Sequence, residues 1–457
     1  MNTILLAYTR VLSLFTLGLL PMACGDGELG PSEFFESAGA GGTAPSRSNT
    51  APGGTSTSGG TSAANKTQGD IGPTVEQPLA ASRFHTCALI NGGVHCWGTN
   101  FNVGMLGNNS TIASTVPVAV VGLTQGVVSI DAGSEHTCAL VNGGVQCWGE
   151  NWKGQLGDNT DTDALVPVQV VGLTQGVSAI SAGGTHACAV VYGGVQCWGI
   201  HDLIYSTGVG SHVPLQVNGL TEGVTAIAAG KAHTCAVVNG GVTCWGSDQD
   251  GQFSLDEGFV CGKKCDAECD HAYDGDAPDD VVSECSRCTF ECNRAGILAP
   301  IEGLSKGVTA IAAGNLHTCA LFNGGVQCWG DNASGQLGDG SHASRPTPRP
   351  VAGLPSGVEA VTAGVDHSCA LANGGVYCWG SNLSKQLGAE LVRESLTPIQ
   401  VNGLTHGVTA ITAGAYHTCA IVSGTVQCWG ANDDGQLGNN DRNATHVPVT
   451  VEGLPTG

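Results

Sequence analysis

The stretch "HTCALINGGVHCWG", residues 85–98, decides the fold of this chain. It places two cysteines, Cys87 and Cys96, around the dipeptide Asn91-Gly92. Asn-Gly is the preferred centre of a two-residue type I′ turn, because both turn positions need positive φ. A turn there pairs Cys87 directly with Cys96, at a non-hydrogen-bonded position of an antiparallel hairpin. Side chains at such a pair lie close enough to form a disulfide.

The same eight-residue gap between two cysteines occurs seven times. We therefore predict seven hairpin disulfides, one per repeat; free thiols or zinc ligands are the alternative. The predicted pairs are Cys87 with Cys96, Cys138 with Cys147, Cys188 with Cys197, Cys235 with Cys244, Cys319 with Cys328, Cys369 with Cys378, and Cys419 with Cys428.

These hairpins belong to a longer repeat. The first cysteines follow one another at steps of 51, 50, 47, 84, 50 and 50 residues. Each unit contains four short apolar segments, of the kinds "GVTAIAAG", "HTCAL", "GVQCWG" and "VPVQVVGL", bounded by glycine or proline. Such segments predict β-strands, and a period near 50 residues is typical of propellers and solenoids. The sequence therefore predicts an all-β repeat protein.

The recurring order Gly-x-x-His-Thr-x-Ala-Leu, then Trp-Gly, then Gly-Gln-Leu-Gly resembles the repeats of the regulator of chromosome condensation family. The resemblance covers about residues 76–457 and implies a seven-bladed β-propeller with four-stranded antiparallel blades. The tryptophans of the seven Trp-Gly pairs are expected to pack in the core or between blades; they are Trp97, Trp148, Trp198, Trp245, Trp329, Trp379 and Trp429. The family's nucleotide-exchange activity is the weakest functional expectation, because a fold does not transfer an activity.

The two ends of the repeat region look complementary. The first unit begins "LAASRFHTCAL" without a "PVxVxGL" segment before it, and the chain ends on "HVPVTVEGLPTG" without a cysteine hairpin behind it. We therefore predict that N- and C-terminal strands pair in one composite blade, because propellers must protect their open sheet edges.

Several features indicate export. Residues 1–23 combine Arg10, an apolar run and a small residue before Cys24, which resembles a bacterial lipoprotein signal that would lipidate Cys24; a plain secretory signal is the alternative. Residues 24–75 are rich in Gly, Ser and Thr and are predicted to be a disordered tether. Twenty-one cysteines also favour an oxidising compartment. We expect a cell-envelope protein, an outer-membrane lipoprotein or an extracellular one, that contacts the membrane only through its lipid.

The long step between repeats comes from an acidic insert at residues 254–296 within the propeller region. Its six cysteines predict three internal disulfides of unknown pairing; they are Cys261, Cys265, Cys269, Cys285, Cys288 and Cys292. Zinc at Cys285-x-x-Cys288 and calcium at Asp274–Asp280 are weaker alternatives to a solvated acidic loop. No metal and no cofactor is predicted.

Candidate binding residues are expected where the repeats vary, because loops on a rigid scaffold carry binding. Phe101, Trp152 and Tyr205 occupy corresponding places after three successive Trp-Gly pairs and predict an aromatic strip on one face. Packing of these rings beneath the loops is the alternative. The seven repeat histidines are assigned to the fold rather than to a metal ring; they are His85, His136, His186, His233, His317, His367 and His417.

No catalytic motif emerges from the sequence. The net charge of −22 makes nucleic acid an improbable partner, because a phosphate backbone would be repelled. The favoured function is a monomeric, non-catalytic scaffold that binds a protein or glycan, as the resemblance implies, since an exported relative inhibits a β-lactamase by docking its loops. The alternative is a secreted polysaccharide lyase or hydrolase that uses the propeller channel, which a cluster of His, Arg and carboxylates would favour.

Overall fold

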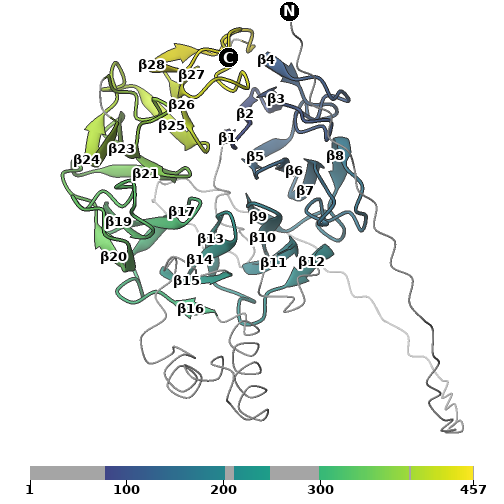
Figure 1. Cartoon of the computed structure of the whole chain (residues 1–457). Coiled ribbons are helices and arrows are strands. Elements are labelled where there is room, and N and C mark those ends of the chain that lie inside the picture. The colour runs from purple at the N-terminus through teal and green to yellow at the C-terminus, as the bar shows by residue number, and fades with distance from the viewer. Residues whose placement is uncertain (1–77, 201–209, 247–297, 391–392, 456–457) are drawn as a thin grey trace, which may run out of the picture. The chain divides into compact units, whose positions relative to one another are not determined.

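A computed structural model describes residues 78–200, 210–246, 298–390 and 393–455. These residues form seven four-stranded antiparallel sheets, arranged as the blades of a β-propeller (Figure 1). The predicted all-β, seven-bladed fold is therefore confirmed. In the described part of the chain, no helix has the length and hydropathy needed to cross a membrane.

Every blade consists of four consecutive strands. The first four blades contain β1 (Leu79–Ala81), β2 (His85–Ile90), β3 (Gly93–Gly98), β4 (Ser114–Ala119), β5 (Val127–Ala132), β6 (His136–Val141), β7 (Gly144–Gly149), β8 (Ala164–Gln169), β9 (Val177–Ala182), β10 (His186–Val191), β11 (Gly194–Gly199), β12 (Ser211–Gln216), β13 (Val224–Ala229), β14 (His233–Val238), β15 (Gly241–Gly246) and β16 (Ala299–Pro300). The last three contain β17 (Val308–Ala313), β18 (His317–Phe322), β19 (Gly325–Gly330), β20 (Arg345–Pro350), β21 (Val358–Ala363), β22 (His367–Ala372), β23 (Gly375–Ser381), β24 (Glu394–Gln400), β25 (Val408–Ala413), β26 (His417–Val422), β27 (Thr425–Gly430) and β28 (Thr445–Thr450). We number the blades 1 to 7 in chain order, from β1–β4 to β25–β28.

The composition of the strands follows their place in the blade. The first strand of each blade contacts the first strands of both neighbouring blades around the axis, which suits small residues such as those of "VTAIAA". The second strand is almost wholly buried and reads as a continuous apolar segment with a Thr or Ser. The fourth strand is the outer edge and carries prolines, as in "RPTPRP" of β20, because an edge strand tolerates residues without an N–H donor.

The hairpin between the second and third strands has the predicted register. Cys87 lies opposite Cys96, and the turn residues Asn91 and Gly92 have φ values of 53° and 78°. Seven disulfides join the second and third strands, with Cα–Cα distances of 4.0 to 4.1 Å, at the seven predicted pairs. They indicate an oxidising compartment.

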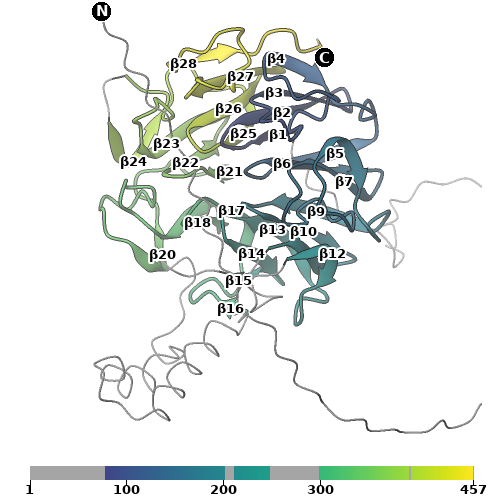
Figure 2. The ribbon, with the colours of Figure 1, turned by 45° about the vertical axis from the view of Figure 1, so that its right-hand side comes forward.

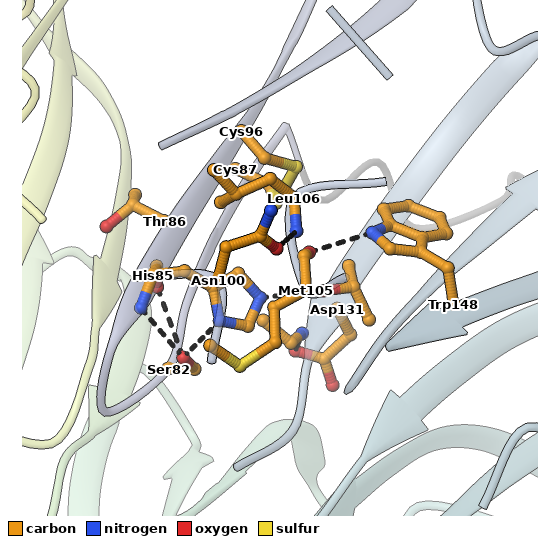
Figure 3. Close-up of a disulfide and its surroundings, with 12 residues drawn as sticks. Ser82, His85, Thr86, Cys87, Cys96, Asn100, Met105, Leu106, Asp131 and Trp148 are labelled. Atoms are coloured by element: carbon orange, nitrogen blue, oxygen red, sulfur yellow. Dashed lines mark hydrogen bonds between the residues drawn. A yellow bond between two sulfur atoms is a disulfide. The ribbon is translucent and has the colours of Figure 1, made fainter. Parts of the chain in front are cut away.

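Each disulfide also lies in the core between two blades. Cys87 and Cys96 of blade 1 cluster with Leu106 and with Trp148 of blade 2 (Figure 3). The Trp148 Nε1 atom donates to the Met105 carbonyl oxygen at 2.9 Å. The packing of a disulfide against the tryptophan of the next blade recurs around the ring, and all seven repeat tryptophans are fully buried. They pack between blades, as predicted.

The predicted composite blade is wrong. Among the seven described sheets, none combines strands from both ends of the chain, because β1 completes blade 1 and β28 pairs within blade 7. The ring closes by packing and by hydrogen bonds between blades 7 and 1. Trp97 Nε1 donates to the Gln436 carbonyl oxygen at 2.8 Å, and the Ala415 amide donates to the Ser82 carbonyl oxygen at 3.1 Å. Three residues suffice for β1, since a first strand pairs with only one strand of its sheet.

Candidate functional site

The antiparallel order of the strands places the variable loops on one face. In every blade, the loop between the first and second strands and the loop between the third and fourth strands leave the sheet on the same side. We call this side the loop face. The opposite side, here the hairpin face, carries the Asn-Gly turns and the connections from one blade to the next. Figure 2 shows the blades from a second direction.

Around the axis, the first strands end in a ring of small residues. Seven alanines at equivalent positions line both central cavities described below; they are Ala81, Ala132, Ala182, Ala229, Ala313, Ala363 and Ala413. A glycine follows in six blades, and the reason is steric. A Cβ atom on Gly230 would lie 2.5 Å from the Gly314 carbonyl oxygen of the next blade. The repeated Ala-Gly therefore reflects the close approach of backbones at the axis.

The seven repeat histidines hold the blades together, as the structural interpretation predicted. All are buried, and the Nε2 atom of six lies within hydrogen-bonding distance of a Thr or Ser hydroxyl on the next blade. His417 Nε2 lies 2.7 Å from Thr86 Oγ1. That hydroxyl donates to the Gln436 carbonyl oxygen at 2.9 Å, so it accepts from an N–H at Nε2 of His417. Burial lowers the pKa of His417 to about 3, which keeps the ring neutral.

His136 is the exception in this ring of contacts. Residue 187 of the next blade is an alanine, whereas the other second strands place Thr or Ser there. His136 therefore has no hydroxyl partner on the next blade, and its ring instead meets the backbone of His186 there, a contact that opposes the lowering of its pKa by burial. Within the described ranges, no group of three or more His, Cys, Asp or Glu side chains is arranged to hold a metal.

Two cavities lie along the axis. The one on the loop face, here called the mouth, has a volume of about 270 Å³, and the inner one, the channel, about 450 Å³. The walls of the mouth are set by the residue that follows Ala-Gly in six blades and Ala-Ser in blade 1, which differs from blade to blade: Arg83, Ser134, Gly184, Lys231, Asn315, Val365 and Ala415.

The buried Asp131 carboxylate in the channel lining has a structural role. Asp131 accepts hydrogen bonds from the Ser181 hydroxyl at 3.0 Å and from the Ala182 amide at 2.9 Å, both in the next blade. Burial raises the pKa of Asp131, and these hydrogen bonds oppose the rise. Thr362 makes the equivalent contact to the Ala413 amide at 2.9 Å. The Asp131 carboxylate thus links neighbouring blades, like the hydroxyls at equivalent positions.

The predicted aromatic residues that the structure describes lie on the loop face. Phe101 and Trp152 follow the third strands of blades 1 and 2, and their exposed fractions are 45% and 58%. Phe101 packs edge-on against Phe84, with ring centroids 4.6 Å apart, and has φ 26°. A positive φ is strained for a bulky residue and is more common at functional sites. Tyr205, Cys24 and the six insert cysteines lie outside the described residues.

Trp152 lies among charged neighbours. The Lys153 Nζ atom is 3.7 Å from the centroid of the Trp152 ring, a cation–π contact. Gln155 Nε2 donates to Glu150 Oε2 at 3.0 Å. Burial, followed by repulsion from Glu135, raises the pKa of Glu150 to about 7. The surroundings of Trp152 are therefore polar and already accommodate a cation against the ring.

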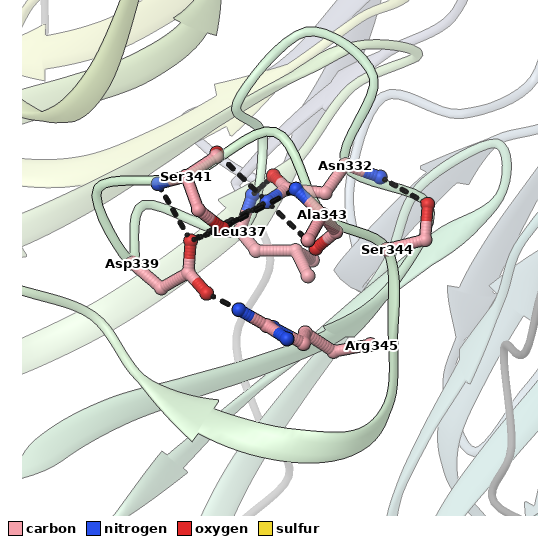
Figure 4. Close-up of polar contacts among 7 residues, drawn as sticks. All are labelled: Asn332, Leu337, Asp339, Ser341, Ala343, Ser344 and Arg345. Carbon is pink, nitrogen blue, oxygen red and sulfur yellow. Dashed lines mark hydrogen bonds and ion pairs between the residues drawn. The ribbon is translucent and has the colours of Figure 1, made fainter.

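An asparagine that sequence reasoning missed organises the loops that carry these residues. In blade 5 the Asn332 Oδ1 atom accepts from the Leu337 amide at 3.0 Å (Figure 4). Its Nδ2 atom donates to the carbonyl oxygens of Ser341 and Ala343, at 2.9 and 3.0 Å. Asn100, Asn151, Asn382 and Asn432 occupy the same place in other blades. The recurrence of Asn after Trp-Gly was the available signal.

Comparison with known proteins agrees with this architecture. A model described as the regulator of chromosome condensation (RCC1) repeat matches residues 91–140, 142–190, 323–371, 373–421 and 423–457. A second model of the same description matches residues 127–155, 224–252, 308–336, 358–386 and 408–436. The chain belongs to the regulator of chromosome condensation repeat family. The segments that the first model matches run from one hairpin to the next, so that model's repeat is out of phase with the blades, whereas the segments of the second model begin at the first strand of a blade.

Solved structures show the same fold. Prp20p from Saccharomyces cerevisiae, described with its binding to Gsp1p and histones, is 21% identical, with a TM-score of 0.65 over 82% of this chain and 86% of Prp20p. Human WBSCR16 is also 21% identical, with a TM-score of 0.63 over 79% of this chain and 93% of WBSCR16. At this level of identity the likeness of the RCC1-repeat chain to both establishes the fold alone.

Proposed function

We propose that this RCC1-repeat protein is an exported, membrane-anchored, non-catalytic scaffold that binds a protein partner through its loop face. The observation that carries the proposal is the exposure of Phe101 and Trp152 on that face. Large aromatic side chains are enriched among residues that dominate protein interfaces. Their loops are held by buried asparagines and by a disulfide-stapled ring, so little conformational entropy is lost when a partner docks.

The cavities favour binding over catalysis. The lining of the mouth and the channel, as far as the described residues form it, includes no histidine, because the repeat histidines are buried between blades. Of the two carboxylates in the channel lining, Asp131 is engaged by the next blade, and Glu359 is exposed to solvent. The cluster of His, Arg and carboxylates that would favour a lyase or hydrolase is therefore not assembled there, and we do not propose an enzyme.

Export and anchoring rest on separate grounds. The seven disulfides fit an oxidising compartment, and the lipoprotein-like segment before Cys24 supports attachment through a lipid. A lipid anchor is tested by metabolic labelling with a palmitate analogue, using Cys24→Ser as the matched variant. Labelling of both chains, or of neither, would argue against an anchor at Cys24.

The binding proposal is tested by capture from a cell-envelope extract, with the full chain as bait. We expect Trp152→Ala and Phe101→Ala to lose a captured protein that Tyr192→Asn retains, because Tyr192 is an exposed aromatic residue on the hairpin face. The captured protein is then purified and titrated against the same three variants. Equal affinity for all three would remove the loop face from the interface and overturn the proposal.

A further inference from the structure

The mouth of the propeller carries only positive charge. Arg83 and Lys231 are the two charged residues in its lining, and the rest are small, apolar or uncharged polar residues. This is notable in a chain with 38 acidic and 16 basic residues. Arg83 and Lys231 occupy the position after the repeated Ala-Gly or Ala-Ser, which differs from blade to blade, so these two side chains are variable positions rather than parts of the repeat.

Both cations lack an acidic partner within the described part of the chain. The ion pairs there join His342 to Glu394 and Arg345 to Asp339, and neither involves the mouth. No side-chain hydrogen bond of Arg83 or Lys231 is formed with a described residue. A positive charge left unpaired beside a cavity is complementary to an anion that enters from outside.

Arg83 is also held in position. The carbon at the centre of its guanidinium lies 4.9 Å from the ring centroid of Phe84 and 5.8 Å from that of Tyr416. Cation–π contacts of this kind cover the flat faces of a guanidinium and leave its N–H edges available. Those edges match the two oxygens of a carboxylate. A group that docks there meets a donor whose geometry is already set.

The mouth is continuous with the aromatic surface. Phe84, over which Arg83 lies, packs against the exposed Phe101 ring at 4.6 Å. Ser134 and Asn315 add a hydroxyl and an amide to the same lining. A partner seated on Phe101 would therefore bring its neighbouring residues over Arg83, and an acidic side chain could reach both cations from the loop face.

We propose that the mouth binds a carboxylate of the docked protein, an Asp or Glu side chain or a C-terminus, between Arg83 and Lys231. This inference rests on the proposed function, since it names the chemistry of the partner at the same face. Carboxylate is favoured over phosphate on nucleic acid, because the net charge of −22 would repel an extended polyanion while a single group can enter the mouth.

The test uses the full chain and a fluorescein-labelled, C-terminally amidated peptide with a single glutamate among glycines and serines, with anisotropy as the readout at low ionic strength. The same peptide with glutamine in place of the glutamate is the neutral control. We expect Arg83→Gln and Lys231→Gln each to weaken binding of the glutamate peptide about tenfold, as for the loss of a charge-assisted hydrogen bond. Lys306→Gln makes the same charge change on the hairpin face and is expected to leave the affinity unchanged. Near-ultraviolet circular dichroism confirms that each variant is folded.

Competition experiments distinguish the sources of the carboxylate. Free glutarate is expected to compete only weakly, and oligogalacturonate no better than glutarate. Stronger competition by oligogalacturonate would assign the mouth to an acidic glycan and overturn the protein assignment. If free glutarate binds with the same affinity as the glutamate peptide, the mouth is a site for a free acid, and the protein assignment is overturned.

The scaffold proposal and the carboxylate inference can be refuted independently of each other. Trp152→Ala is expected to leave the affinity for the glutamate peptide unchanged, because Trp152 does not line the mouth. If the peptide does not bind, or binds equally to Arg83→Gln and Lys231→Gln, the carboxylate inference is wrong, while Trp152-dependent capture of a partner would still support the scaffold.

Discussion

Acid should open the propeller, because the contacts between blades depend on neutral histidines. Burial lowers the pKa to about 3 for His85, His233, His367 and His417 and to about 4 for His136 and His317. Repulsion from neighbouring histidines adds to the effect at His85, His233 and His367. Each of these side chains has an ordinary pKa near 6.5 once the chain unfolds.

The sign follows from linkage. Between about pH 4 and 6 the unfolded chain binds more protons than the native chain, so the free energy of unfolding falls as the pH falls. Each histidine is expected to lower the free energy of unfolding by about 2 kcal/mol between neutral pH and pH 5, so the six together lower it by about 12 kcal/mol. That is comparable to the whole free energy of unfolding of a typical domain, about 5 to 15 kcal/mol. We therefore expect an unfolding midpoint between about pH 4 and 5.

Some carboxylates act in the opposite direction. Burial raises the pKa of Asp131, Glu150 and Asp366, so protonation of these groups at low pH favours the native state. Glu150 and Asp366 are partly exposed, where solvent weakens the effect. Three opposing groups reduce the proton uptake expected from six histidines without reversing its sign.

The assay is urea unfolding followed by tryptophan fluorescence, at a series of pH values and constant ionic strength. The slope of the free energy of unfolding against pH gives the proton uptake, expected to lie between about three and six protons near pH 5. His417→Gln keeps a donor toward Thr86 and should lower the uptake by about one proton, whereas the exposed Asn402→Ala removes no titratable group and should leave it unchanged. An uptake below two protons, or a native fluorescence spectrum at pH 3.5, would refute the reasoning.

Three further predictions concern stability and are checked by urea denaturation at pH 7. Ala187→Ser should raise the free energy of unfolding by about 1 kcal/mol, because it supplies the hydroxyl that His136 lacks; no change would mean that a hydroxyl at this position does not stabilise the contact between blades 2 and 3. Asn332→Ala should lower it by about 3 kcal/mol, because the buried Leu337 amide loses its acceptor; exposed Asn402→Ala is the control. Tyr192→Asn should raise it by about 1 kcal/mol, because Tyr192 has φ 50° at a turn position where five other hairpins place asparagine, and a fall would show that its ring contacts outweigh the strain.

Features set by local chemistry could be predicted from the sequence. The hairpin register follows from the Asn-Gly turn and the two-residue alternation of strands, so Cys87 and Cys96 could be paired by residue number alone. The burial of the tryptophans followed from their recurrence in every repeat. These inferences required no knowledge of how one blade meets the next.

Features that depend on the ring as a whole were harder to predict. A repeat of about 50 residues can be divided at any point, so its sequence does not say where a blade begins. The division here is decided by Leu79–Ala81, three residues that complete blade 1 and remove the need for a composite blade. The partner of each histidine was equally hidden, because Thr86 and His417 are 331 residues apart.

The candidate site could be predicted from the sequence only in part. Phe101 and Trp152 were found because they depart from the repeat, and the same criterion applied two residues after the last alanine of each first strand would have selected Arg83 and Lys231. It was not applied there, since those positions look like turn residues until seven of them are seen around one axis.

The disulfides stabilise the individual blades, whereas the histidines stabilise the contacts between blades. Each disulfide closes a hairpin within one blade and lies beneath a tryptophan of the next, so it adds apolar surface to an interface without crossing it. The links that cross between blades are hydrogen bonds from tryptophan and histidine side chains and from backbone amides. The ring is thus covalently rigid within each blade and depends on burial and neutral charge between blades. A scaffold of this kind can vary its loop-face side chains, because the side chains of Arg83, Phe101, Trp152 and Lys231 form none of those hydrogen bonds, and the inter-blade bond at Lys231 is made by its backbone carbonyl.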